Sequence, residues 1–221
     1  MNLVITITGT SSCFAVSGNP VESVFTSIYQ YGNWGTNEEG KGFSGLGSKL
    51  EHCKHYIAFL EQFLQKNQIT SVVDFGCGDW TFSQYIRWGD IHYTGFDVVK
   101  SVVDDLKKKY SSPLRQFIHA DGLSTDLPAA DLLICKDVLQ HLSNENIHAF
   151  LKQCSKFKYC LITNDVDPAT KTSTNPDIKN GYYRFLDITQ APFNVQGEKV
   201  LTYISRGTCT AQVVLITNSK D

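Results

Sequence analysis

The chain has 221 residues, of which 42% are hydrophobic and 19% charged, and these ordinary values exclude the disordered and fibrous classes. Its formal net charge of −2 gives no broad basic surface for a phosphate backbone, so we expect no nucleic acid among its partners. The length suits a single α/β domain with a substantial core.

The cysteines and the N-terminus indicate where such a protein resides. Seven cysteines stand at irregular spacing without a C-x-x-C pair, so we expect mostly buried free thiols, a reducing compartment and no metal site. The first 18 residues lack the basic start of a signal peptide, and threonines interrupt their apolar stretch, which favours an N-terminal arm. No apolar run has the ~18 to 20 residues of a membrane span. We therefore predict a soluble, cytoplasmic protein without membrane partners.

From Ser48 onward, helical and strand patterns alternate. Ser48 can cap a helix whose apolar positions recur at helical spacing through Lys66. Strands are then predicted at residues 71–75, 92–96, 115–119, 131–135 and 159–163, and helices at 81–87, 100–110 and 144–154. Strands separated by helix-length segments predict a parallel sheet with right-handed crossovers.

The end of the chain follows a different pattern. Residues 199–205 and 210–217 are strand-like runs joined by a short turn at Arg206–Gly207, which leaves no room for a helix. They predict a hairpin, so the last strand is expected to run antiparallel to its neighbour. The polar stretch at about 165–197 has no clear periodicity, and we interpret it as an insertion that is either disordered or functional.

Acidic residues follow each of the five predicted parallel strands, at the sheet edge where ligands of open α/β sheets bind. After the first strand, Gly76 and Gly78 allow a tight turn and a close approach of the backbone to a ligand. Asp97 ends the second strand about 20 residues later, where a carboxylate can accept hydrogen bonds from both hydroxyls of a ribose. The spacing therefore predicts a nucleoside ligand.

The composition of the glycine turn argues against a dinucleotide. The third glycine of the G-x-G-x-x-G pattern is missing, and Asp74 and Asp79 would repel a diphosphate. These acids suit a ligand with an ammonium and a sulfonium group, and S-adenosylmethionine carries both. A nicotinamide-dependent oxidoreductase is therefore the weaker hypothesis.

Four segments, in order, resemble the motifs of class I S-adenosylmethionine-dependent methyltransferases. They are VVDFGCG at 72–78, YTGFDVV at 93–99, HADGLSTDLPAADLLICKDVLQHL at 119–142, and the terminal hairpin. The resemblance covers roughly residues 48–217. It implies a Rossmann-like α/β fold with a seven-stranded, mostly parallel sheet, an antiparallel last strand and helices on both faces. It also implies S-adenosylmethionine as the cofactor and residues 48–221 as the methyltransferase domain.

The same resemblance implies roles for single residues. Asp74 and the Gly76–Gly78 turn would hold the methionine end, Asp97 the ribose, Asp121 the adenine edge, and Val98 the adenine face. The cofactor-binding residues that it implies are Asp74, Gly76, Cys77, Gly78, Trp80, Asp97, Val98, Asp121, Gly122, Lys136 and Asp137, and a second resemblance, of the N-terminal segment, adds Trp34, Ser44 and Gly45. The alternative for each acid is a helix cap or a solvated loop residue.

Two further segments resemble a bacterial group of small, mostly uncharacterised methyltransferases. In the first, VFTSIYQYGNWGTNEEGKGFSGLGSKL at 24–50, an aromatic stretch and the turn SGLGS at 44–48 would close over the cofactor, and we expect residues 1–47 to form an N-terminal arm and aromatic lid. The alternative is that its aromatics pack on the core, and both can hold together. In the second, GYYRFLDITQAPF at 181–193, Arg184 either pairs with Asp187 to fix the loop or contacts the substrate.

The leading candidates for a general base in methyl transfer are His141 and Asp165, with Tyr182 and Tyr183 as further candidates. The fifth strand is not followed by the Asn/Asp-Pro-Pro-aromatic signature of exocyclic amine methylation, and no Pro-Cys nucleophile follows the fourth. The expected acceptor is therefore an oxygen or nitrogen, most readily on a small molecule. Protein side-chain methylation and a non-catalytic binding module stay open as alternatives, and the oligomeric state is not predicted.

Overall fold

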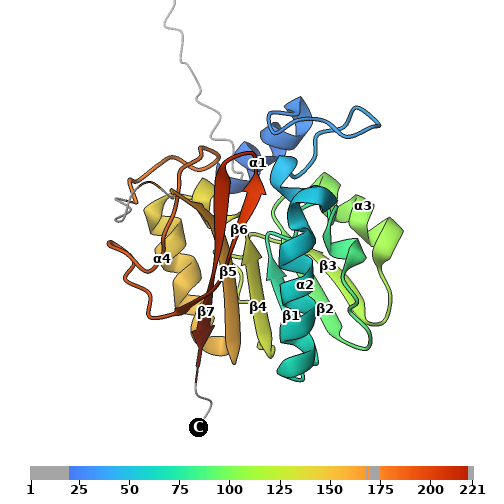
Figure 1. Cartoon of the computed structure of the whole chain (residues 1–221). Helices are drawn as coiled ribbons and strands as arrows, with labels where there is room; N and C mark the ends of the chain where they lie inside the picture. Colours follow the sequence, from blue (N-terminus) through green and yellow to red (C-terminus); the bar gives the residue numbers. More distant parts are fainter. Residues whose placement is uncertain (1–19, 168, 170–174, 219–221) are drawn as a thin grey trace, which may run out of the picture.

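A computed structural model describes residues 20–167, 169 and 175–218 of the chain, and the first part of the predicted N-terminal arm lies outside them. Seven strands form one sheet in the order β3-β2-β1-β4-β5-β7-β6 (Figure 1). They are β1 (Ser71–Phe75), β2 (His92–Asp97), β3 (Arg115–His119), β4 (Leu132–Lys136), β5 (Tyr159–Val166), β6 (Glu198–Arg206) and β7 (Cys209–Thr217). Strands β1 to β5 are parallel, and β7 is antiparallel to both β5 and β6. The predicted α/β class and the antiparallel last strand are confirmed.

The strand order places a candidate site. The chain runs outward from β1 to β3 and then crosses to β4 on the other side of β1, so the order reverses between β1 and β4. Connections that leave two neighbouring strands in opposite directions open a crevice beyond their carboxyl ends. The segments after β1, β2 and β4 meet at this edge of the sheet.

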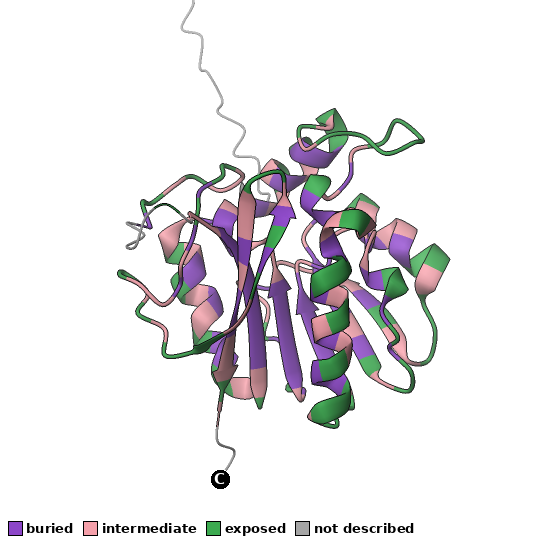
Figure 2. Ribbon diagram, viewed as in Figure 1, coloured by how far each residue is buried: buried purple, intermediate pink, exposed green. Residues whose placement is uncertain are grey.

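Helices cover both faces of the sheet. They are α1 (Pro20–Tyr31), α2 (Leu50–Lys66), α3 (Lys100–Tyr110) and α4 (Asn144–Gln153). Successive strand residues face opposite sides, so Val72 packs in one core cluster with residues of α2 and α3, while Val73 packs in the other with residues of α1 and α4. The central strands are buried on both sides (Figure 2), which explains their nearly continuous apolar runs.

The helix predicted at 81–87 is wrong. That segment contains only a short 3₁₀ turn, η2 (Ser83–Tyr85), after Trp80, whose φ of 61° is left-handed. The indoles of Trp80 and Trp88 are buried in the core, and Trp88 Nε1 donates a hydrogen bond to Ser83 O at 2.9 Å. Two large side chains that reach the core from a loop occupy the space that a helix face would otherwise fill.

Two of the element boundaries that differ from the prediction have a clear structural cause. Ser48 does not cap α2, because it closes the 3₁₀ turn η1 (Leu46–Ser48) by donating from Oγ to Gly45 O at 2.7 Å, and Lys49 caps the helix without a side-chain bond. Strand β5 continues three residues beyond the predicted end at Thr163, because the long partner β7 pairs with it up to Val166. Asp165 therefore lies inside a strand.

The described part of the insertion is ordered by side chains rather than by helices or strands. Asn175 Nδ2 donates to Asp187 O and Ala191 O, both at 2.8 Å, and Leu186 is buried in the core. The predicted alternative of an Arg184–Asp187 pair is wrong, because Asp187 Oδ2 pairs instead with Lys199 Nζ at 2.8 Å.

The six cysteines within the described residues are free, and five of them are buried, as predicted. Within the same residues, no helix combines the length and the apolar character needed to span a bilayer.

Candidate functional site

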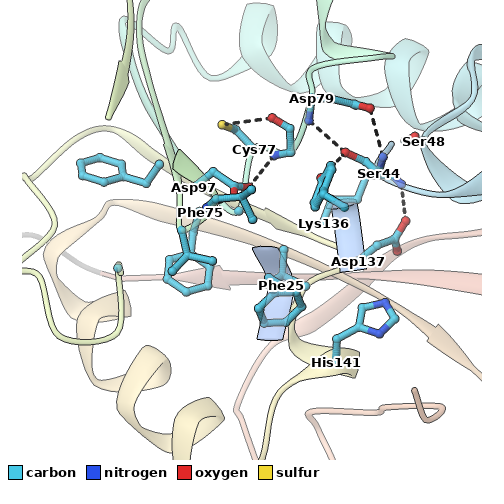
Figure 3. A pocket seen from close by; sticks show the side chains of 18 of the residues that line it. Phe25, Ser44, Ser48, Phe75, Cys77, Asp79, Asp97, Lys136, Asp137 and His141 are labelled. Atoms are coloured by element: carbon cyan, nitrogen blue, oxygen red, sulfur yellow. Dashed lines mark hydrogen bonds and ion pairs between the residues drawn. The ribbon is translucent and has the colours of Figure 1, made fainter. Parts of the chain in front are cut away.

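A pocket lies at the predicted edge of the sheet, beyond β1, β2 and β4 (Figure 3). Its empty volume, including the part open to solvent, is about 910 Å³. The sheet edge supplies its base, and α1 with the following loop covers it. The lining residues are Val21, Phe25, Tyr29, Trp34, Ser44, Ser48, Phe75–Phe82, Phe96–Val99, Ala120–Leu123, Lys136–Val138, His141 and Leu142.

The glycine turn after β1 is set by close contacts on both sides. Gly76 and Gly78 have φ of 72° and 56°, in the left-handed region. A Cβ on Gly76 would lie 2.5 Å from Val138 Cγ2, and one on Gly78 would lie 2.4 Å from Ser44 Oγ. Gly76 N and Cys77 N both donate to Phe96 O, at 2.8 and 3.0 Å. The backbone therefore passes closely between the segments after β4 and before α2.

Asp97 fastens this turn to the end of β2. Its buried carboxylate accepts hydrogen bonds from Gly78 N at Oδ2 and from Val99 N at Oδ1, both at 2.9 Å. Burial raises the pKa of Asp97 to about 6, against these two backbone donors, which lower it. Each carboxylate oxygen can accept a second hydrogen bond, so the group keeps capacity for a ligand hydroxyl.

The loop that covers the pocket is fixed to the same turn through Ser44. Ser44 N donates to Asp79 Oδ2 at 3.0 Å, Asp79 N donates to Ser44 Oγ at 2.9 Å, and Tyr29 Oη lies 2.7 Å from Ser44 Oγ. Asp79 Oδ1 also accepts from the Thr81 hydroxyl at 2.6 Å. This cluster joins α1, the covering loop and the glycine turn.

A buried ion pair lies at the carboxyl end of β4. Lys136 Nζ lies 2.5 Å from Asp137 Oδ2 and donates to Gly47 O at 3.3 Å. Burial alone would lower the pKa of Lys136, but the attraction of Asp137 outweighs it and holds this pKa above its usual range. Asp137 has a left-handed φ of 59°, and its Oδ1 is buried without a hydrogen-bond partner among the described residues. This oxygen therefore keeps the capacity to accept a hydrogen bond from a ligand donor.

His141 stands in the 3₁₀ turn η3 (Leu139–His141), with its ring between two aromatic side chains. Its centroid lies 4.9 Å from that of Trp34 and 5.8 Å from that of Tyr183. Nδ1 lies 3.0 Å from Tyr182 O, and a carbonyl can only accept, so we assign the proton to Nδ1. Burial lowers the pKa of His141, which favours the neutral ring. Nε2 then carries the lone pair.

The pocket brings together most residues predicted from the sequence. Thirteen of them line it: Trp34, Ser44, Gly76, Cys77, Gly78, Trp80, Asp97, Val98, Asp121, Gly122, Lys136, Asp137 and His141. Gly45, Asp74 and Asp165 do not belong to the lining.

Asp74 and Asp165 have other partners. Asp74 Oδ2, in β1, accepts a buried hydrogen bond from Tyr93 Oη of the neighbouring strand β2 at 2.7 Å. Burial raises the pKa of Asp74 to about 7. The Asp165 carboxylate accepts hydrogen bonds from the Ser205 hydroxyl at 3.0 Å and the Tyr183 hydroxyl at 3.1 Å. It also pairs with Arg206 at 3.1 Å. Burial raises the pKa of Asp165, and this network occupies both of its oxygens.

Comparison with known proteins agrees with this geometry. Residues 72–157, less than half of the chain, match the family described as methyltransferase domain, and this segment carries the glycine turn, Asp97 and His141. No curated protein sequence is significantly similar to the chain.

Solved structures share the fold at low sequence identity. Magnesium protoporphyrin IX methyltransferase from Synechocystis with bound S-adenosylmethionine has a TM-score of 0.63 and 13% identity over 92% of this chain and 99% of that chain. Its complex with S-adenosylhomocysteine has a TM-score of 0.56 and 15% identity over 76% and 84%. Human N-acetylserotonin methyltransferase has a TM-score of 0.55 and 16% identity over 91% and 61%. The fold is that of the class I S-adenosylmethionine-dependent methyltransferases, and the resemblance found in the sequence is confirmed.

Proposed function

We propose that the chain is a cytoplasmic S-adenosylmethionine-dependent methyltransferase that acts on an oxygen or nitrogen of a small-molecule acceptor. The observation that carries this proposal is the union, in one pocket, of the glycine turn, the Asp97 carboxylate and the unpartnered Asp137 Oδ1. A nucleoside with a cationic side chain offers hydroxyl donors for the first carboxylate and an ammonium donor for the second.

The other lining residues fit the rest of this cofactor. Val98 and Leu142 give the adenine end an apolar wall, and Gly122 keeps that wall open because a Cβ there would lie 2.6 Å from the Phe75 ring. Lys136 is a buried cation available to the methionine carboxylate while it remains paired with Asp137. The residues present therefore match each polar end of the cofactor with a group of complementary charge or hydrogen-bonding character.

The bound cofactor supplies the electrophilic methyl group, and the residues of this chain position and protect the reaction. Trp34 and Phe25 place aromatic surface over the pocket, which excludes water from the cationic centre. His141 Nε2 would accept the proton released by a hydroxyl or ammonium nucleophile. We assign the base role to His141 rather than Asp165, because Asp165 already pairs with Arg206 and two hydroxyls.

The names of the structural neighbours favour a small-molecule acceptor. The Synechocystis protein is a magnesium protoporphyrin IX methyltransferase and the human one an N-acetylserotonin methyltransferase, and neither name describes a protein acceptor. Methylation of a protein side chain is the alternative, and the distribution of a labelled methyl group distinguishes the two.

Two measurements test the proposal. Titration calorimetry should show binding of S-adenosylmethionine and S-adenosylhomocysteine but not of NAD(H), and absence of binding by folded protein would refute the proposed function. Incubation of cell extract with enzyme and cofactor labelled at the methyl group should then yield label in the small-molecule fraction. Label in protein would move the assignment to side-chain methylation, and no label anywhere would leave a cofactor-binding module.

A further inference from the structure

Arg184 is a buried guanidinium without a protein partner. The residue is 5% exposed, and Nε, Nη1 and Nη2 all lack a hydrogen bond within residues 20–167, 169 and 175–218. A buried, unpaired cation costs several kcal/mol in real proteins. Native structures retain such a group where a ligand completes it, so Arg184 calls for an anion.

The backbone around Arg184 runs alongside the turn that carries His141. Arg184 N donates to Gln140 O at 3.2 Å, and Gly181 N donates to His141 O at 2.8 Å. Between these two contacts, Tyr182 O accepts from His141 Nδ1. The segment that holds the proposed base in its tautomer therefore also holds Arg184, and the guanidinium charge acts on the His141 ring electrostatically.

The other charges of this region are already balanced. Arg206 pairs with Asp165 at 3.1 Å, Lys136 with Asp137 at 2.5 Å, and Lys199 with Asp187 at 2.8 Å. None of the three carboxylates in these pairs is a hydrogen-bond partner of Arg184.

Asp177 is the carboxylate whose charge acts on Arg184. Its Oδ1 accepts hydrogen bonds from Asn144 N at 2.7 Å and Ile178 N at 2.9 Å. Among the residues that the structure describes, it forms no ion pair with the guanidinium. Asp177 therefore offsets the Arg184 charge through space without satisfying any of its donors, and the guanidinium keeps its hydrogen-bonding capacity for a ligand.

We propose that Arg184 binds an anionic group of the methyl acceptor, a carboxylate or a phosphate, and so places the acceptor nucleophile at His141. This inference rests on the proposed methyltransferase function and adds the acceptor's charge to it. A guanidinium suits this task because its planar donors bind carboxylate and phosphate through two parallel hydrogen bonds. The acceptor is thus an anionic small molecule rather than a neutral or cationic one.

Aromatic surface next to Arg184 guides the choice of probe. Tyr183 and Phe185 flank Arg184 in the chain, are partly exposed, and have ring centroids 5.7 Å apart. Benzoate and phenyl phosphate combine an anion with a ring that can pack on such surface, and benzamide is the neutral counterpart of benzoate.

The test uses the full chain saturated with S-adenosylhomocysteine, so that a failure of cofactor binding is seen separately. We expect benzoate or phenyl phosphate to bind about tenfold or more tightly than benzamide, and the comparison of the two anions identifies the preferred group. Arg184→Gln should abolish this preference while S-adenosylhomocysteine affinity changes by less than about twofold. Lys179→Gln removes an exposed positive charge from the same segment and should leave the preference intact.

Two results overturn the inference: no preference for either anion over benzamide in the wild-type complex, or an equal preference in the Arg184→Gln variant. Arg184→Lys keeps the charge without the planar fork, so it should bind the anion more weakly than wild type and more tightly than Arg184→Gln. That variant also decides the question if Arg184→Gln does not fold. Loss of S-adenosylhomocysteine binding by wild-type protein would instead refute the proposed function.

Discussion

Ser44 and Asp79 lie 35 residues apart in the chain and exchange two hydrogen bonds, from Ser44 N to Asp79 Oδ2 at 3.0 Å and from Asp79 N to Ser44 Oγ at 2.9 Å. This pair fixes the loop before α2 against the glycine turn after β1. The loop that covers the pocket and the glycine turn that lines it are therefore held together as one unit.

Ser44→Ala should loosen that unit. The substitution removes the acceptor of Asp79 N and the partner of the Tyr29 hydroxyl, and each lost hydrogen bond costs about 1 kcal/mol. We expect S-adenosylhomocysteine to bind roughly tenfold more weakly in calorimetry. Ser155→Ala removes an exposed hydroxyl that only caps its own turn and should leave the affinity unchanged. Equal affinities for the two variants would show that the cover does not contribute to binding.

Gly78→Ala should be severe because a clash adds to backbone strain. A Cβ at Gly78 would lie 2.4 Å from Ser44 Oγ, whereas Gly89, with a similar φ of 53°, has open space around the same position. We expect Gly89→Ala to lower the free energy of unfolding by about 1 kcal/mol through φ alone. Gly78→Ala should cost ~1 to 3 kcal/mol more and abolish cofactor binding. Denaturant titration of both variants measures the difference between their unfolding free energies. Equal losses in the two variants would show that the contact between the new Cβ and Ser44 Oγ does not destabilise the protein.

Asp97 and Asp74 should differ in their effects on binding, although Asp97 is bonded to the glycine turn and Asp74 precedes it by two residues. Asp97→Ala removes a buried carboxylate that lines the pocket, so affinity for S-adenosylhomocysteine should fall by about 2 kcal/mol, as for a hydrogen bond to a charged group. Asp74→Asn keeps an acceptor for Tyr93 Oη outside the lining and should change the affinity by less than about twofold. A comparable loss of S-adenosylhomocysteine affinity in both variants would show that Asp74 binds the methionine end of the cofactor after all.

Asp74 should also make folding stability depend on pH. Burial raises its pKa from 3.8 to about 7 in the folded protein, so the folded state binds the extra proton between these values. The stabilisation is complete below pH 3.8 and is lost as the pH rises through 7. Urea titrations of Asp74→Asn from pH 4 to 7 should therefore lack part of the wild-type decline in unfolding free energy. A parallel decline in both proteins would contradict the shifted titration.

His141→Gln should lower kcat by about 10²-fold or more if Nε2 accepts the acceptor's proton, with little change in cofactor affinity. Because burial lowers the pKa of His141 below 6.5, wild-type kcat should hold its plateau into mildly acidic solution and decline only below that value. In the His141→Gln variant, kcat should not show this decline at acidic pH. An unchanged kcat would assign His141 to packing between Trp34 and Tyr183.

Much of the scaffold followed from local pattern. The bounds of β1, β3 and α3 match the prediction, because each has a clear period and a turn residue or change of polarity at its ends. The glycine turn and Asp97 were found because their spacing along the chain reflects the pitch of one strand-to-strand crossover.

The remaining differences come from tertiary contacts. The segment after Trp80 has the length of a helix, but its two buried indoles make a loop the better packing solution. Asp165 was expected at a strand end, and only the register with β7 extends the strand past it. The Ser44–Asp79 pair joins residues far apart in sequence, and no local pattern encodes such a partner. Arg184 could be singled out by type, but its missing partner is visible only in three dimensions.

The place of β7 in the sheet has a consequence for biosynthesis. This strand comes last in the order of translation among the seven, yet it lies between β5 and β6 rather than at an edge. Until Cys209–Thr217 has left the ribosome, one edge of β5 presents an unpaired backbone to solvent and β6 has no neighbour to join. The nascent protein therefore depends on its final strand to close the sheet, and a chain cut before that strand should aggregate rather than fold.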